Sequence, residues 1–389
     1  MALTGKRRKD TLHGDCRTRL TRKNNTRGHT SLPMQDLDRL SRTFHRFAEQ
    51  ECAGMSALYE SLCHSLAEDR DLLAISANAR LGQPVPNLFM AAVHWLLLAG
   101  ARHAVTDYYP DINSEGPARG DSYPSFRSFC RDRIDDITAL ISTRLVQTNV
   151  VRRCAVLLPA FAVAMGREQE RPLSLVEIGA SAGLNLLWDR YSYTYSDERR
   201  WGDPNSPVPL SSVIRGSLRP PLPESIPQVV FRVGLDLNPV DISDRYAVDW
   251  LRALVWPERV DEARMLEDAL EMAKDDPPEI LAGDALELLP EVLQGIPSDS
   301  TLCLYHTNTL NQFPSEARER FSGLVEEHGS VRDLSLISVE GRAGHHHCAV
   351  ELTQYRNGLK TNRRLADNDS HGNWIQWLES GNALTGSKD

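Results

Sequence analysis

Short apolar runs recur along the second half of the chain, and amphipathic stretches separate them. The runs are LSLVEI (173–178), VFRVGLDL (230–237), EILAG (279–283), TLCLYH (301–306) and LSLISVE (334–340). The spacing between them predicts helices at about 183–190, 243–255, 259–274, 285–293 and 315–327. Because parallel strands need long crossover connections, this alternation predicts an α/β protein with a mainly parallel sheet.

The first half of the chain has a different pattern. Apolar residues recur at helical spacing from about residue 34 to 165, and no strand-like alternation intervenes. A loop rich in Pro, Gly and Asp spans 108–126, and the stretch that follows it predicts two helices that break near 147–149. At 389 residues the chain is long enough for two cores, so we expect a helical domain at 34–165 and an α/β domain at 166–389.

The first 33 residues form a basic arm that we expect to be disordered. Residues 1–30 hold nine Lys and Arg against Asp10 and Asp15, a net charge of +7, while the whole chain carries −9. The acidic remainder argues against nucleic acid as a main partner, although weak contact through the arm stays open. The longest apolar run, at 88–100, is too short to cross a membrane, and no secretory signal is evident. We therefore expect a cytoplasmic protein whose seven scattered cysteines are reduced.

The stretch VEIGASAGLN at 176–185 has two incompatible interpretations. As G-x-S-x-G it is a nucleophile elbow, with Ser181 as the attacking group of an α/β serine hydrolase. Such an elbow needs an oxyanion donor from an earlier strand–helix loop, and only helices are predicted upstream of Ser181. As E-x-G-x-x-x-G it is a glycine turn after the first strand, which cradles a nucleoside cofactor at a helix N-terminus.

The cofactor interpretation requires acidic residues at the ends of the next two strands. GLDLNP supplies Asp236 for the ribose hydroxyls, and AGDALELLP supplies Asp284 for the adenine amine. A dinucleotide site is disfavoured because G-x-G-x-x-G is absent and 59 residues separate Glu177 from Asp236, against the roughly 20 of that fold. We therefore predict S-adenosylmethionine binding by Glu177, Gly179, Ser181, Gly183, Asn185, Asp236, Asp284 and Ala285. In the alternative interpretation, these glycines only allow close helix–sheet packing.

The same residues belong to a longer resemblance. The runs QTNVVRRCAVLLPAFAVAM, LSLVEIGASAGLNLLWDRYSYTY, WGDPNSPVPL, GLDLNPVDI, WLRALVWPE, AGDALELLP and GNWIQWLE resemble a largely bacterial family, domain-of-unknown-function family 2332, over about residues 38–380. The resemblance implies a Rossmann-like, class I methyltransferase-type sheet behind a helical N-terminal region, and no established reaction. An acid usually follows the QTN triplet in that family, whereas Val150 stands here.

Polar residues near the expected site suggest how a substrate is held. His306 and Asn308 follow the fourth strand, and His306 is our candidate base because imidazole titrates near physiological pH. Four residues at the predicted helix break are candidates for binding a carboxylate of the cofactor or of an acidic substrate, namely Arg144, Gln147, Asn149 and Arg153. Capping and salt bridging are the alternative roles for these side chains. We expect the acceptor of the methyl group to be a small molecule. A further alternative is that the protein keeps the fold but has no catalytic activity.

Two further segments carry predictions. The long connection at 192–227 suggests an inserted hairpin, formed by YSYTYSD and VPLSSVIRG, whose aromatic residues could line a substrate pocket (Tyr191, Tyr193, Tyr195 and Trp201). GHHHC at 344–348 does not predict a metal site, because adjacent histidines on a strand alternate faces. Only a short loop follows the fifth strand, so we predict an antiparallel hairpin of 348–355 and 359–366 through Asn357-Gly358, with this loop on the ligand side.

Overall fold

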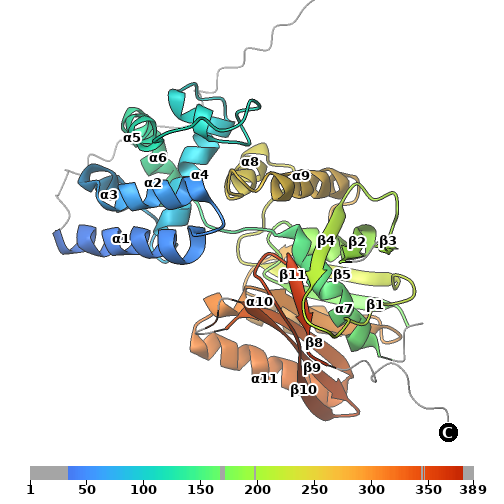
Figure 1. The fold of residues 1–389 in the computed structure, drawn as a ribbon. Helices are drawn as coiled ribbons and strands as arrows, with labels where there is room; N and C mark the ends of the chain where they lie inside the picture. Colours follow the sequence, from blue (N-terminus) through green and yellow to red (C-terminus); the bar gives the residue numbers. More distant parts are fainter. Residues whose placement is uncertain (1–33, 167–170, 197–198, 343–344, 346, 380–389) are drawn as a thin grey trace, which may run out of the picture.

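The computed structural model describes residues 34–166, 171–196, 199–342, 345 and 347–379. Figure 1 shows a group of helices from the first half of the chain beside a sheet that is covered by helices on both faces. The basic arm that the sequence predicts lies outside the described residues. None of the described helices combines the length and the apolar character that crossing a membrane requires.

The helical part has six α-helices and two irregular turns of helix. They are α1 (Met34–Phe47), the π-helix η1 (Ala48–Cys52), α2 (Ala57–Ala67), α3 (Arg70–Ser76), α4 (Val85–Leu98), the 3-10 helix η2 (Ala104–Tyr108), α5 (Tyr123–Asp132) and α6 (Ile134–Thr143). Side-chain caps start two of the α-helices: Ser56 accepts a hydrogen bond from Tyr59 N, and Asp69 accepts from Asp71 N. Phe44, Phe89 and Phe126 fill the core between the helices.

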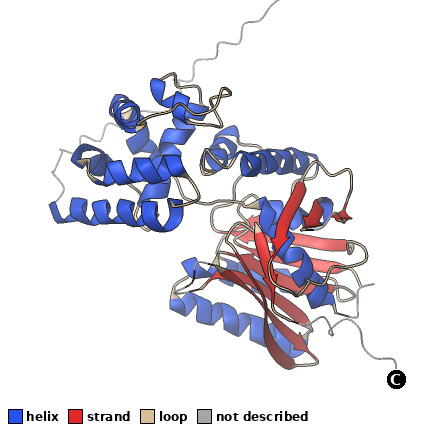
Figure 2. Ribbon diagram, viewed as in Figure 1, coloured by secondary structure: helices blue, strands red, loops and turns tan. Residues whose placement is uncertain are grey.

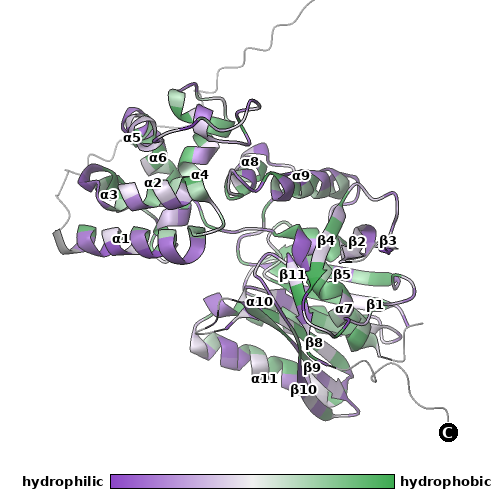
Figure 3. Cartoon of the chain, viewed as in Figure 1, coloured by the Kyte–Doolittle hydropathy of each residue, from purple (hydrophilic) through white to green (hydrophobic). Residues whose placement is uncertain are grey.

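The stretch before the sheet contains one more helix than the sequence predicts. The expected break near 147–149 is present as an irregular segment at 144–150, but α5 and α6 are also separated at Arg133. The chain then forms the 3-10 helix η3 (Val151–Arg153) and α7 (Cys154–Met165). Every residue of α7 is buried, and its side chains belong to the core of the sheet. In Figure 3 the visible side of this helix is correspondingly coloured as apolar.

The five predicted strands are confirmed, and they form a parallel block at one end of an 11-stranded sheet, with the strand Ile280–Ala282 at the edge. They are β1 (Leu173–Ile178), β5 (Val229–Asp236), β6 (Ile280–Ala282), β7 (Thr301–Thr307) and β8 (Leu334–Gly341). Their spatial order is β6-β5-β1-β7-β8, and each neighbouring pair is parallel. The chain thus moves outward from β1 first in one direction and then in the other. In open α/β sheets, ligands bind beyond the carboxyl ends of the strands at such a reversal point.

Helices cover both faces of this sheet (Figure 2). On one face lie α7, the 3-10 helix η4 (Leu184–Arg190) and α9 (Val260–Asp275), while α10 (Ala285–Gly295) and α11 (Ser315–Val331) cover the other. The helix that the sequence predicts at about 183–190 is present, and it is the 3-10 helix η4. α8 (Arg245–Ala253) leaves the sheet and packs on α4, where Trp250 and Leu254 enter the helical core. The two parts of the protein are therefore packed together.

The C-terminal hairpin is confirmed. β9 (Cys348–Arg356) is antiparallel to both β8 and β10 (Leu359–Asn368). Its turn is formed by Asn357 with φ 51° and Gly358 with φ 76°, both in the left-handed region that a two-residue type I′ turn requires. The last strand, β11 (Trp374–Trp377), pairs with β10 and extends the sheet.

The hairpin predicted for the inserted segment is wrong. β2 (Ser192–Tyr195) pairs in parallel with β4 (Pro209–Ile214), whereas its antiparallel partner is the short strand β3 (Arg200–Gly202). The three predicted pocket tyrosines are completely buried in the core, and their hydroxyls donate to the backbone carbonyls of Leu184, Trp188 and Ala155. The tyrosine side chains of this segment therefore pack in the core and do not line a pocket. The fold as a whole is mixed α/β, with a large sheet in which the five predicted strands form a parallel block at one end.

Candidate functional site

A cavity of about 860 Å³ opens between the helical part and the carboxyl ends of the strands. One wall comes from η1, α2 and α4, a second from α8, α9 and the loop between them, and the floor from segments that follow β7, β8 and β10. Its lining includes Phe47, Met55, Tyr59, Trp256, Arg259, Glu262, Asn308, Asp369 and Trp374. At this volume it can accommodate a small molecule.

The glycine turn at the end of β1 has a conformation that its sequence explains. Gly179 and Gly183 have φ of 76° and 72°, which glycine adopts without strain. Ser181 also has a positive φ, 56°, which is uncommon for a residue with a side chain. Its N–H donates to Asp236 Oδ2 at 2.8 Å, so the carboxylate at the end of β5 holds the strained turn in place.

Asp236 makes two further hydrogen bonds inside the protein. Its Oδ1 accepts from Asn238 N at 2.8 Å and from Gln147 Nε2 at 3.0 Å. Gln147 lies on the segment 144–150 that leaves the helical part, so two residues predicted for different roles are in direct contact. Asn149 lies on the same segment, lines the cavity and accepts from Leu184 N at 3.0 Å. The segment is therefore fastened at two points, to the residue that follows the glycine turn and to the acid at the end of β5.

Glu177 lies beneath the turn and is almost completely buried. Its carboxyl accepts from Asn185 Nδ2 at 3.3 Å and from Tyr305 Oη at 3.2 Å. Burial raises the pKa of Glu177 to about 8, and these two hydrogen bonds limit the rise. The residue therefore holds a proton at neutral pH and links β1, η4 and β7 as a positioning group.

The two residues predicted after β6 begin a helix. Asp284 is the N-cap of α10, and its Oδ1 accepts from Leu286 N at 2.8 Å. Ala285, the first residue of the helix, is buried. Asp284 itself is only half-buried, so part of its carboxylate still faces solvent.

The structure does not place His306 in the cavity lining. Alternate residues of β7 face opposite layers, so Tyr305 points toward α7 and His306 points toward Phe321 of α11. The His306 Nδ1 is 2.7 Å from Glu340 Oε1, and Glu340 also accepts from the N–H groups of Thr309 and Leu310. This pair fixes the loop after β7, and its geometry gives no support to His306 as a base.

The remaining predicted residues separate into three environments. Arg144 stacks over the ring of Trp250, 5.6 Å from its centre, and so fastens α6 to α8. Asn308, with φ 52°, lines the cavity beside Cys348. Arg153 is buried at the end of η3, where its Nε donates to Ser370 O at 2.8 Å.

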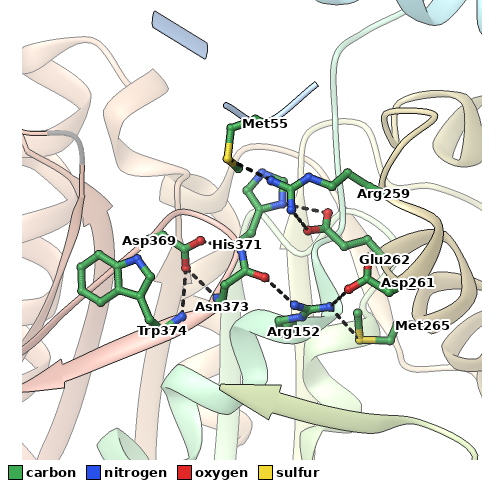
Figure 4. Close-up of polar contacts among 10 residues, drawn as sticks. All are labelled: Met55, Arg152, Arg259, Asp261, Glu262, Met265, Asp369, His371, Asn373 and Trp374. Carbon is green, nitrogen blue, oxygen red and sulfur yellow. Dashed lines mark hydrogen bonds and ion pairs between the residues drawn. The ribbon is translucent and has the colours of Figure 1, made fainter. Parts of the chain in front are cut away.

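Figure 4 shows the polar side chains that gather on one side of the cavity. Arg152 donates to Asn373 and Asp261, while Asp369 accepts from Asn373 N and Nδ2. Glu262 lies between Arg259, at 3.6 Å, and His371, at 2.9 Å. Burial opposes ionisation of Glu262, but the hydrogen bond from His371 and the charges of His371 and Arg259 lower its pKa overall.

Part of this site was accessible from sequence and part was not. The loop 341–347 was predicted on the ligand side, and its described residues Gly341, His345 and His347 do line the cavity. Arg259, Glu262 and the 369–373 loop escaped prediction because no local motif marks them. Among the described residues no three His, Cys, Asp or Glu side chains are grouped as a metal site.

Comparison with known proteins gives one match. The family model described as "Uncharacterized protein conserved in bacteria (DUF2332)" matches residues 41–377, which covers the helical part, the sheet and the cavity between them. Neither the curated proteins nor the solved structures give a match. Since the match spans most of the chain, the protein belongs to this bacterial family of uncharacterised proteins, DUF2332.

Proposed function

We propose that the protein is an S-adenosylmethionine-dependent methyltransferase that acts on a small molecule. The cofactor would lie beyond the carboxyl ends of β1, β5 and β6, and the acceptor in the adjacent cavity. One observation carries the proposal: Ser181 N bonds to the Asp236 carboxylate at the carboxyl ends of β1 and β5, beside the reversal point of the strand order. This contact joins a glycine turn to an acid at neighbouring strand ends, as a class I methyltransferase-type site requires.

The neighbouring residues fit the nucleoside part of such a cofactor. A carboxylate has about four lone-pair positions, and three protein donors use Asp236, which leaves capacity for a ribose hydroxyl. Leu237 follows directly and is 67% exposed, an unusual position for a large apolar side chain and a suitable face for a purine ring. The free part of the Asp284 carboxylate supports the contact to the adenine amine that its sequence position predicts.

Two contacts define how the site would have to open. Gln147 and Asn238 N both donate to Oδ1 of Asp236, so a ribose hydroxyl would have to use the open position on Oδ2 or displace the Gln147 amide. The side chain of Thr309 lies so close to Gly179 that a β-carbon there would be 2.4 Å from it. The backbone of the turn is therefore covered by the loop after β7, and the exposed approach is from the side of Leu237.

S-Adenosylmethionine supplies an electrophilic methyl group on its sulfonium. The protein's part is to orient the acceptor and to take its proton if it is a hydroxyl or an amine. His371 suits the second task better than His306, because it lines the cavity and its Nδ1 is 2.9 Å from Glu262. A carboxylate in this position orients the imidazole and stabilises its protonated form, as in other histidine bases.

The serine hydrolase alternative lacks its central contact. The Ser181 hydroxyl is buried and has no hydrogen-bond partner among the described residues, so no histidine activates it. A fluorophosphonate probe tests this directly. Labelling that disappears in Ser181→Ala would favour the hydrolase, whereas an unlabelled protein agrees with our proposal.

Calorimetric titration with S-adenosylmethionine and S-adenosylhomocysteine tests the proposed function. We expect saturable binding by the wild-type protein and weaker binding by Leu237→Asp, because a carboxylate replaces the apolar face offered to the purine. Leu81→Asp is the matched control, since Leu81 is 95% exposed in the helical part, away from the strand ends. Absence of heat and of any melting-temperature shift at millimolar ligand would reject the proposal and favour a non-catalytic protein.

A further inference from the structure

Arg153 is a buried arginine without an anionic partner. Its side chain donates from Nε to Ser370 O at 2.8 Å and from Nη1 to Thr307 Oγ1 at 3.4 Å. Its Nη2 makes no hydrogen bond to the described protein, and no described carboxylate lies within ion-pair distance of the guanidinium. Burying a charge without a partner is strongly unfavourable, so such a group calls for an explanation.

Two other arginines, Arg152, which is buried, and Arg232, which is partly buried, do have partners. Arg152, the preceding residue, pairs with Asp261, and Arg232 forms a two-pronged ion pair with Asp189 at 2.7 and 2.8 Å. Burial lowers the pKa of Arg153 below its usual value, and Cys348 and the more distant carboxylates of Glu340 and Glu262 act against this. The protein therefore keeps a positive charge here without neutralising it by direct contact.

The position of Arg153 connects it to the site. Thr307 is the last residue of β7, next to β1 at the reversal point of the strand order, and Ser370 lines the cavity. The loop after β10 packs tightly on η3, since a β-carbon at Gly372 would lie 2.8 Å from Arg152 O. The guanidinium is thus held between the strand ends and Ser370 of the cavity wall, while Arg153 itself is not among the lining residues, so that a ligand carboxylate would reach it past the Ser370 loop.

We propose that Arg153 is the receptor for a carboxylate of a bound small molecule. A planar guanidinium with free N–H donors matches a carboxylate in charge and in geometry. The carboxylate has two possible sources: the amino-acid end of the cofactor, or an acidic acceptor in the cavity. The aromatic side chains of Phe47, Tyr59, Trp256 and Trp374 line that cavity and would suit an aromatic acid. The identification of these sources rests on the proposed function.

Two matched pairs of probes distinguish the sources. S-Adenosylhomocysteine and 5′-methylthioadenosine share the nucleoside and differ in the amino-acid end, which only the first has. Naphthalene-2-carboxylate and its amide share the ring system and differ in charge. Each is titrated calorimetrically into the wild-type protein and into Arg153→Met, with Arg232→Met as a control that removes a paired, partly buried arginine outside the cavity lining.

We expect at least one carboxylate probe to bind the wild-type protein about tenfold more tightly than its uncharged partner, and this preference to disappear in Arg153→Met. If Arg153→Met loses the preference for S-adenosylhomocysteine over 5′-methylthioadenosine, the carboxylate belongs to the cofactor. If it loses the preference for the naphthoate over its amide, the carboxylate belongs to the acceptor. Arg232→Met should retain the preference. If neither nucleoside binds but the wild-type protein still prefers naphthalene-2-carboxylate to its amide, the proposed function is rejected and the carboxylate receptor is retained.

The stability of the ligand-free variants gives a second readout. Arg153→Met removes an unpaired buried charge, so its melting temperature should equal or exceed that of the wild type. Arg232→Met leaves Asp189 without its partner and should melt at a lower temperature. The proposal is overturned if neither carboxylate is preferred by the wild type, or if Arg153→Met keeps the preference.

Discussion

Gln147 donates a hydrogen bond of 3.0 Å to Asp236, across 89 residues of sequence. It connects the segment that leaves the helical part to the acid at the end of β5, and that acid also bonds to Ser181 N in the glycine turn. The position of the helical part and the conformation of the turn are therefore coupled through one carboxylate.

Asp236→Asn should destabilise the protein. Both Asp236 oxygens accept from N–H donors, so an amide nitrogen at either position would face another donor. We expect a loss of about 1–3 kcal/mol in the free energy of unfolding, measured by urea denaturation. Asp284→Asn is the control, because asparagine caps a helix as well as aspartate does. Equal stability of the two variants would show that the Asp236 contacts contribute nothing.

Glu177→Gln should change how stability depends on pH. The folded-state pKa of Glu177 is raised to about 8 from an ordinary value of 4.5, so the folded protein keeps a proton that the unfolded chain releases. The contribution of this proton to the free energy of unfolding is thus fully present below about pH 4.5. It is lost as the pH rises to about 8, by up to roughly 1.4 kcal/mol per pH unit. Glutamine mimics the protonated acid and should remove this loss.

Urea denaturation between pH 5 and 8.5 measures this difference. Glu177→Gln and the wild type should have similar free energies of unfolding near pH 5. Toward pH 8 the variant should become progressively more stable than the wild type. Glu287→Gln, on the exposed side of α10, is expected to follow the wild-type profile. Parallel profiles of the wild type and Glu177→Gln would contradict a proton on Glu177 at neutral pH.

Gly179→Ala should be more harmful than Gly54→Ala. The two glycines have similar positive φ, 76° and 73°, so the backbone strain is matched at about 1–2 kcal/mol. A β-carbon at Gly54 meets nothing within 4 Å, whereas one at Gly179 would lie 2.4 Å from Thr309. We expect a further loss of about 1–3 kcal/mol for Gly179→Ala. Combining it with Thr309→Gly should recover this further loss, and no recovery would mean that the close approach is unimportant.

Glu340→Gln should release the loop after β7. Burial alone would raise the pKa of Glu340, but hydrogen bonds from His306, Thr309 N and Leu310 N lower it overall. A lowered pKa contributes stability that is present above the ordinary value of 4.5 and is lost as pH falls through the folded-state value. We expect the variant to lose about 1.5–3 kcal/mol at pH 7, because these bonds are to a charge. The gap should narrow below pH 4, and a constant gap would contradict this account.

The sequence by itself determined which segments form the parallel strands of the sheet. The period of the apolar runs places the five parallel strands within one or two residues, because burial on both faces demands continuous apolar stretches. Asn357-Gly358 determined the C-terminal hairpin, since few residues adopt the left-handed conformations that its turn needs. The glycine turn at 179–183 and the acids at 236 and 284 could also be predicted, because local residue types at strand ends indicate them.

Only the tertiary structure decided which of these residues face the site. Strand alternation directs His306 to α11 and Thr307 to Arg153, and no local pattern indicates which layer adjoins the cavity. The inserted strands β2 and β4 have hairpin-like patterns, yet they pair in parallel because β3 lies between them in the chain and takes the opposite edge of β2. Arg152 and Arg153 are adjacent in sequence, but one has a carboxylate partner and the other has none. That difference depends on which distant segments pack against η3, and it exists only in the folded chain.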